Sequence, residues 1–197
     1  FSNNSAQNNG LNGISVDSDS IIVDTIWQSN LPYILGSKSV ATGVTLTLKE
    51  GTVVKSIGYL VVYGRLITEG TLTNPVVFTS VADDEYGGDT NNNSTSTLAA
   101  KGNWQQLMFQ SSATSTLEGV KVRYGGGGCS MGFCQVTVNL VSGGLEIKNS
   151  VIEKNVWGIY SGAGSCPTAF ETLKLTNVVF SENDKDIVIP YDTCSPL

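Results

Sequence analysis

The side chains best suited to chemistry lie in an acidic segment of the first half of the chain. Asp83, Asp84 and Asp89 supply carboxylates, and Asn91 and Asn93 follow with amide oxygens. Ca²⁺ takes about six to eight such oxygens from a backbone that can wrap around it. The segment lacks the Glu of the twelfth EF-hand position, so it predicts a structural calcium site of another kind. A solvated polar insertion without metal is the alternative.

Basic side chains are the second set that could do chemistry. The chain contains no His, which removes the commonest general base and the commonest transition-metal ligand. A polysaccharide lyase would have to use Arg65, Lys121 or Arg123 beside carboxylates. Lys121 and Arg123 share one strand face, but their sequence neighbours supply no carboxylate, and Arg65 with Glu69 is better explained as an exposed ion pair. We therefore expect a protein that is not an enzyme, and keep lyase activity as the alternative.

Aromatic side chains offer a third chemistry, the stacking of sugar rings. Candidates for such a strip are Trp27, Tyr33, Tyr59, Tyr63, Tyr86, Trp104, Trp157 and Tyr160. Trp104 and Trp157 lie in apolar alternation, so we expect these two in the core or in a cap rather than on a sugar-binding surface.

Four cysteines constrain the compartment: Cys129, Cys134, Cys166 and Cys194. Their spacing includes no CxxC pair, which argues against zinc. An even count in a polar chain predicts two disulfides and an oxidising environment. Of the three connectivities that four cysteines allow, Cys129–Cys134 with Cys166–Cys194 is the most local.

Composition also limits partners and location. The net charge is −6, and the 11 basic residues are scattered, which argues against electrostatic binding to nucleic acid or to an anionic membrane. No apolar run approaches the ~20 residues of a transmembrane helix. We expect an extracellular or cell-surface protein whose signal peptide has been removed, and a sequence that starts inside a larger protein is the alternative.

A repeating scaffold must position these side chains. Residues 145–155 (LEIKNSVIEKN) match residues 173–183 (LKLTNVVFSEN) 28 positions later. Elsewhere, short alternating segments end at Gly, Asn or Pro, and nothing shows a helical period. The pattern predicts an all-β, single-stranded parallel β-helix (a solenoid) of about six coils, each of about 25–28 residues, with essentially no helix. A β-sandwich is the alternative.

The same pattern divides the chain. Residues 1–19 form a polar N-terminal tail, residues 20–197 form the β-helix domain, and residues 81–101 form an acidic loop insertion within it. Asn149 and Asn177 end equivalent strands of the repeat, so we expect both in turns, stacked as a ladder that bonds to the backbone.

Five segments carry a family resemblance. They are GVTLTLKEGTVVK (43–55), LVVYGRLITEGT (60–71), NPVVFTS (74–80), DDEYGGDT (83–90) and GNW (102–104). Their order resembles the right-handed parallel β-helix modules of secreted or cell-surface bacterial and archaeal proteins, over about residues 25–183. The resemblance implies the fold and an extracellular setting. It implies little about activity, because such modules occur in adhesins and structural proteins, and related coils carry polysaccharide lyases.

The ends of a solenoid expose strand edges that can template pairing. The residues expected to cap the ends or to mediate assembly are Ile21, Ile22 and Val23 at one end and Ile187, Val188 and Ile189 at the other. We therefore expect an extracellular structural or adhesive protein, for which the self-assembling subunit of a filament, sheath or layer is one form. Its expected partner is another copy of the same chain, added head to tail or strand to strand, or a surface polysaccharide. The alternative function is that of a carbohydrate-binding or lyase-like module.

Overall fold

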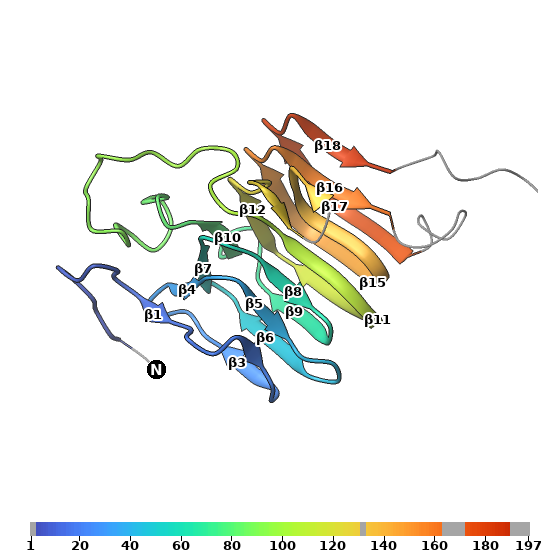
Figure 1. The fold of residues 1–197 in the computed structure, drawn as a ribbon, viewed down its shortest axis with the longest axis horizontal. Coiled ribbons are helices and arrows are strands. Elements are labelled where there is room, and N and C mark those ends of the chain that lie inside the picture. Colours follow the sequence, from blue (N-terminus) through green and yellow to red (C-terminus); the bar gives the residue numbers. More distant parts are fainter. Residues whose placement is uncertain (1–2, 131–132, 163–171, 190–197) are drawn as a thin grey trace, which may run out of the picture.

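The protein is described from a computed structural model, which places residues 3–130, 133–162 and 172–189. The described elements are all β-strands, and those of the main sheet pair in parallel. The chain winds upward from its first strands to its last as a stack of coils (Figure 1). The all-β parallel β-helix expected from the sequence is confirmed.

Each coil contributes to three faces. Face A contains β1 (Ile14–Ser15), β4 (Tyr33–Leu35), β7 (Val53–Ser56), β10 (Val76–Ser80), β12 (Val120–Arg123) and the ends of β15 (Val136–Glu153) and β17 (Leu173–Ser181). Face B contains β2 (Ser20–Ile21), β5 (Lys38–Val40), β8 (Leu60–Val62), the beginnings of β11 (Leu107–Glu118) and β15, β16 (Trp157–Ser161) and β18 (Lys185–Val188). Face C contains β3 (Thr25–Trp27), β6 (Thr45–Lys49), β9 (Arg65–Glu69) and further segments of β11, β15 and β17.

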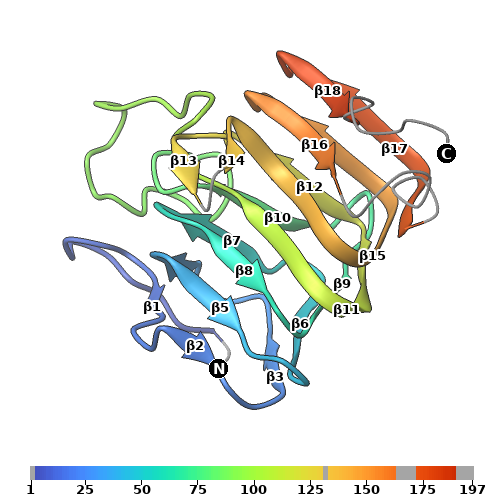
Figure 2. The same cartoon turned by 45° about the vertical axis from the view of Figure 1, so that its right-hand side comes forward.

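The strands of face B lie in order across the turned view (Figure 2). Faces A and B each hold seven described strand segments and face C holds six, so the described residues form six coils and begin a seventh. This agrees with the predicted number. A separate antiparallel hairpin, β13 (Cys129–Ser130) with β14 (Phe133–Cys134), interrupts the fifth coil.

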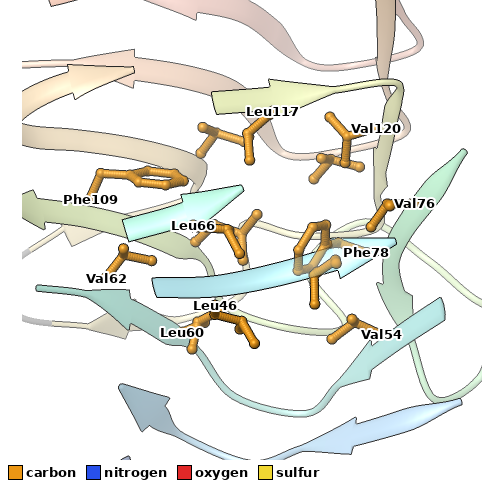
Figure 3. Close-up of a cluster of buried hydrophobic side chains, with 14 of the residues drawn as sticks. Leu46, Val54, Leu60, Val62, Leu66, Val76, Phe78, Phe109, Leu117 and Val120 are labelled. Atoms are coloured by element: carbon orange, nitrogen blue, oxygen red, sulfur yellow. The ribbon is translucent and has the colours of Figure 1, made fainter. Parts of the chain in front are cut away.

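Matched register stacks the inward side chains in columns. On face A one column runs through Tyr33, Val54, Phe78, Val122 and Ile152, and each of these residues is at most 5% exposed. Apolar side chains from the three faces meet them in one continuous core (Figure 3). Truncating such a side chain costs about 2–5 kcal/mol, so the core is the main force holding successive coils together.

The predicted coil length was wrong for most of the chain. Ile14 pairs with Tyr33, 19 positions later, and Tyr33 pairs with Val54, 21 positions later. The 28-residue spacing belongs to the match of Leu145 with Leu173. The basic coil is therefore shorter than the repeat suggested, and the extra residues of longer coils lie in the loops between strands.

Asparagines line the corner between faces C and A. Asn149 and Asn177 adopt left-handed backbone conformations, with φ of 47° and 52°, which Asn tolerates better than most residues. The Asn177 Nδ2 group donates to Asn149 Oδ1 (2.8 Å), and Asn149 Nδ2 donates to Glu118 Oε1 (2.8 Å). The expected stack is present, but its bonds join side chains rather than side chain to backbone.

The N-terminal segment is more ordered than a free tail. Residues 14–15, expected within the tail of residues 1–19, form β1 and pair with β4. Asn12 donates its backbone N–H to the Thr90 carbonyl (2.7 Å) and its Nδ2 group to the Asp89 carbonyl (3.0 Å). The tail therefore runs beside the acidic insertion.

Candidate functional site: the acidic insertion and the first coil

The acidic insertion covers part of the outer side of face A. It leaves the C-terminal end of β10 and forms the large loop at the side of the solenoid (Figure 1). Beneath it lie Lys55 of β7 and Arg123 of β12, which are 0% and 1% exposed although both point away from the apolar core. The loop is therefore packed on two buried cations.

Arg123 is the centre of this cluster. Its Nη1 group contacts Glu85 Oε2 at 2.6 Å, and its Nε group lies 3.7 Å from Asp83 Oδ2 and 3.5 Å from Glu153 Oε1. Its Nη2 group also donates to the Tyr124 hydroxyl (2.8 Å). Burial works to lower the pKa of Arg123, but Glu85 and Asp83 outweigh it, so the pKa is raised above its usual value. The guanidinium stays charged and paired.

Lys55 holds the backbone of the loop. Its Nζ group donates to the carbonyls of Asp83 (2.8 Å) and Gly88 (2.6 Å). Burial lowers the pKa of Lys55 from 10.5 to about 8, against the opposing pull of Asp83, Asp84 and Asp89. Lys55 therefore ties the two ends of the Asp83–Gly88 turn to β7.

Two of the five predicted calcium ligands serve the protein itself. The Asp83 carboxylate accepts bonds from Thr79 Oγ1 and from the Glu85 backbone N–H (3.2 Å), besides facing Arg123. The Asp89 carboxylate accepts the backbone N–H groups of Asn93 (3.1 Å) and Ser94 (2.8 Å). Asp83 acts as a counter-ion, and Asp89 closes a turn.

The other three predicted ligands each have an oxygen without a hydrogen bond. Asn91 and Asn93 both donate their Nδ2 groups to Thr97 Oγ1, at 3.2 and 2.7 Å. Their Oδ1 atoms, and Asp84 Oδ1, are buried and accept no hydrogen bond. Within the described part of the chain, no group of three or more Cys, Asp or Glu side chains is placed to hold a metal ion. Any ion here would depend on amide and carbonyl oxygens in addition to the carboxylate of Asp84.

The expectation that Lys121 and Arg123 lack neighbouring carboxylates was wrong. Strand register sets Arg123 opposite Glu153, one coil later, and the insertion brings Glu85. Lys121 Nζ also lies 3.6 Å from Glu153 Oε1. Burial tends to lower the pKa of Lys121, but its bond to Tyr86 and the charge of Glu153 raise it. A raised pKa is the opposite of what a general base needs at neutral pH.

The predicted Arg65–Glu69 ion pair was also wrong. Lys49 pairs with Glu69 across face C, where the two residues stand in register. Arg65 Nε instead donates to the Thr114 carbonyl (3.0 Å). Glu69 and Arg65 thus each find their partner on a neighbouring coil and not on their own strand.

The aromatic residues serve different parts of the molecule. Trp104 is buried (1% exposed) and donates its Nε1–H to the Arg123 carbonyl (2.7 Å), which confirms its expected place in the core. Trp157 is only partly buried, and Lys185 Nζ lies 4.3 Å from its ring centroid, so of the two expected places, core or cap, the core does not apply to it. Trp27 stacks on Tyr33 with ring centroids 4.4 Å apart. Trp104, Trp157 and Trp27 therefore lie in different parts of the molecule and do not line one common surface.

The cysteine prediction is confirmed in part. Cys129 and Cys134 form a disulfide that joins β13 to β14. Cys166 and Cys194 lie outside the described residues.

The first coil exposes an apolar groove of about 480 Å³. We call it the first-coil surface and define it by Ile14, Ile21, Ile22, Val23, Ile26 and Trp27. Ile22, Val23 and Ile26 are 72%, 65% and 58% exposed. In the described part of the chain β1, β2 and β3 each pair with one strand only, on the side of the second coil. Their other edges carry unpaired backbone groups.

The predicted end residues occupy the two ends of face B. Ile21 is buried (8% exposed), whereas Ile22 and Val23 are exposed to solvent on the turn after β2. At the other end β18 carries Val188 and Ile187, which is 41% exposed, and Ile189 follows the strand. The structure therefore separates the two predicted groups along the solenoid axis.

Comparisons with protein-family models, with curated proteins and with solved structures find no match to this chain. The resemblance to secreted β-helix modules therefore stays a prediction. Among the residues that the structure describes, no helix has the length and apolar character needed to cross a membrane.

Proposed function

We propose that the protein is a non-enzymatic structural module of the extracellular space or cell surface, which associates with its partner through the first-coil surface. One observation carries the proposal, namely three large apolar side chains exposed beside three unpaired strand edges. The Cys129–Cys134 disulfide supports an oxidising location.

Association at this surface has a physical driving force. Covering an apolar side chain yields about 25 cal/mol for each Å² removed from water, and Ile22, Val23 and Ile26 are mostly exposed. A strand added to an open edge also gains backbone hydrogen bonds. Exposed apolar groups of this kind mark interaction sites in soluble proteins.

The test compares substitutions at two exposed apolar positions. The double variant Ile22→Lys/Ile26→Lys should abolish or strongly reduce association of the full chain, measured by light scattering and negative-stain microscopy. Leu98→Lys is the matched control, because Leu98 is 81% exposed but lies in the insertion. Equal association of both variants and the unmodified chain would refute the proposal.

We further propose that the insertion binds Ca²⁺ as a structural ion. The supporting observation is the set of three buried oxygens without hydrogen bonds, Asp84 Oδ1, Asn91 Oδ1 and Asn93 Oδ1. Such acceptors are costly to bury unpaired, and carboxylate and amide oxygens suit Ca²⁺. The ion would order the loop and would take no part in a reaction.

Calorimetric titration with Ca²⁺ after chelation tests this proposal. Asn91→Ala/Asn93→Ala should weaken binding at least about tenfold and cancel the rise in Tm caused by Ca²⁺. Asn92→Gly is the control, because Asn92 lies between them, is exposed and has a positive φ of 51° that Gly accepts. Absence of both binding heat and a Tm shift in the unmodified chain would rule calcium out.

A further inference from the structure

We propose that the partner of the first-coil surface is the C-terminal end of a second copy of this chain, stacked head to tail in the register of the solenoid. The inference rests on the proposed function and names its partner. Three parallel strand edges, one on each face, are unpaired together. A partner that pairs with these edges must itself present parallel strands wound in the same way, and the last described strands of this chain do so on face A through β17 and on face B through β18.

The strand register connects the two ends on face B. Successive partners form one column from the first strand to the last: Ser20, Ser39, Val61, Met108, Asn139, Tyr160 and Val188. A second copy in register would therefore place its Ser20 directly beyond Val188. The distance between neighbouring strands is about 4.8 Å, so the two Cα atoms would come within the range of an ordinary strand pair.

Face A continues in the same way through the core. Its inward column begins at Ile14, passes through the buried residues described above and ends at Phe180. Ile14 and Phe180 are both only partly buried and pack on the core from opposite ends. Stacking in register sets one against the other, so that the apolar column continues from copy to copy.

Charge favours this orientation over a head-to-head pair. The first coil carries Asp17, Asp19 and Asp24, and residues 14–32 contain no Lys or Arg. Two first coils would bring these carboxylates together with no Lys or Arg from either coil between them, whereas residues 172–189 offer Lys174 and Lys185 beside Glu182, Asp184 and Asp186. Asp17 lies three residues before Ser20, and Lys185 lies three residues before Val188. Head-to-tail stacking in register thus places the exposed Asp17 near the exposed Lys185.

Cysteine cross-linking tests the orientation. Ser20→Cys and Val188→Cys are made as separate full-length variants, checked for folding by circular dichroism and mixed under mild oxidation. Since a disulfide needs Cα atoms about 4.4–6.8 Å apart, the mixture should give a covalent heterodimer, and a chain with both substitutions should give a ladder of oligomers. The unmodified chain, treated in the same way, controls for its native cysteines. A covalent dimer of Ser20→Cys alone would indicate head-to-head contact and overturn the inference.

A charge exchange tests the register independently. Asp17→Lys and Lys185→Asp should each weaken association about threefold to tenfold, and the double variant should recover it, because the opposite charges then meet again. No recovery together with no cross-link, while Ile22→Lys/Ile26→Lys still abolishes association, would overturn the head-to-tail arrangement and leave the proposed function standing. Monomers throughout the series would overturn both.

Discussion

Two regions of this solenoid connect successive coils with polar side chains in different ways. In the regular coils of residues 145–183, neutral amides of Asn149, Asn155, Asn177 and Asn183 bond from one coil to the next. Under the acidic insertion, the charged groups of Lys55 and Arg123 are buried against loop carbonyls and carboxylates. The amides stack within the coils themselves. The two cations, in contrast, are buried only because the acidic insertion, which interrupts a single coil, packs over them.

The comparison implies different costs of disruption. An exposed amide of the ladder, such as that of Asn177, can bond to water when it loses its partner. A buried cation that is removed leaves acidic groups facing each other in a place with little solvent. Charge burial should therefore make the insertion region more sensitive to single substitutions than the repeat.

Replacing Arg123 should have the largest effect. Arg123→Met leaves Asp83 and Glu153 without their common cation, and we expect the free energy of unfolding to fall by about 3–5 kcal/mol, measured by urea denaturation at pH 7. Lys121→Met is the control on the same strand. Its side chain is 21% exposed and pairs with Glu153 at 3.6 Å, so a loss below about 1 kcal/mol is expected. Similar losses for both variants would contradict the central role of Arg123.

Within the repeat, Asn155 should matter most. It is fully buried, accepts the Gly125 backbone N–H (2.8 Å) and donates Nδ2 to the Val122 carbonyl (3.0 Å). Asn155→Ala leaves both groups unpaired, and we expect a loss of about 2–3 kcal/mol in the same denaturation experiment.

Asn177→Ala is the matched control for that substitution. Asn177 is exposed and makes one ladder bond to Asn149, so its removal should cost less than about 1 kcal/mol. If Asn177→Ala were as damaging as Asn155→Ala, the ladder rather than burial would be the source of stability.

The pH dependence of Lys55 should be a smaller effect than the loss of Arg123 or of Asn155. The folded protein releases the Lys55 proton at about pH 8, and the unfolded chain releases it at about 10.5. The unfolded state therefore binds more protons between these values, so stability rises with pH in this window. Relative to Lys55→Met, the unmodified chain should gain about 2 kcal/mol between pH 7 and pH 9.5.

The unmodified chain and Lys55→Met are denatured with urea at each pH. Because both proteins share all other titrating groups, the difference between their free energies of unfolding reports on Lys55. A difference that does not change with pH would mean that the ammonium of Lys55 is not destabilised by burial. A difference that falls as the pH rises would mean that its charge is a net stabilising contribution.

Several features followed from local sequence. The match of residues 145–155 with residues 173–183 predicted the pairs Leu145–Leu173 and Ile152–Phe180, and the structure has both. The close spacing of Cys129 and Cys134 predicted their disulfide. The β-branched residues at 21–23 and 187–189 were predicted at the ends, and the structure places them at opposite ends of face B.

Other features could not be predicted because they depend on spacing between coils. Glu153 lies 30 positions after Arg123, yet the register of β12 with β15 sets them side by side. For the same reason, Glu69 pairs with Lys49 of the preceding coil and not with Arg65 on its own strand. The length of each coil varies with its loops, so the sequence alone did not reveal which residues of neighbouring coils face each other.

By itself, the sequence determined the parallel stack of coils and its alternating core, because these depend on short local patterns. It determined the asparagine corners of residues 145–183 as well, because Asn149 and Asn177 stand at matching positions of the repeat. Only the tertiary structure decided which groups the acidic segment covers. A loop of this composition can face solvent or cover buried cations, whether or not it also binds calcium, and nothing within it shows which. The choice follows from its folding back over face A, where Lys55 and Arg123 lose their hydration and must find oxygen partners.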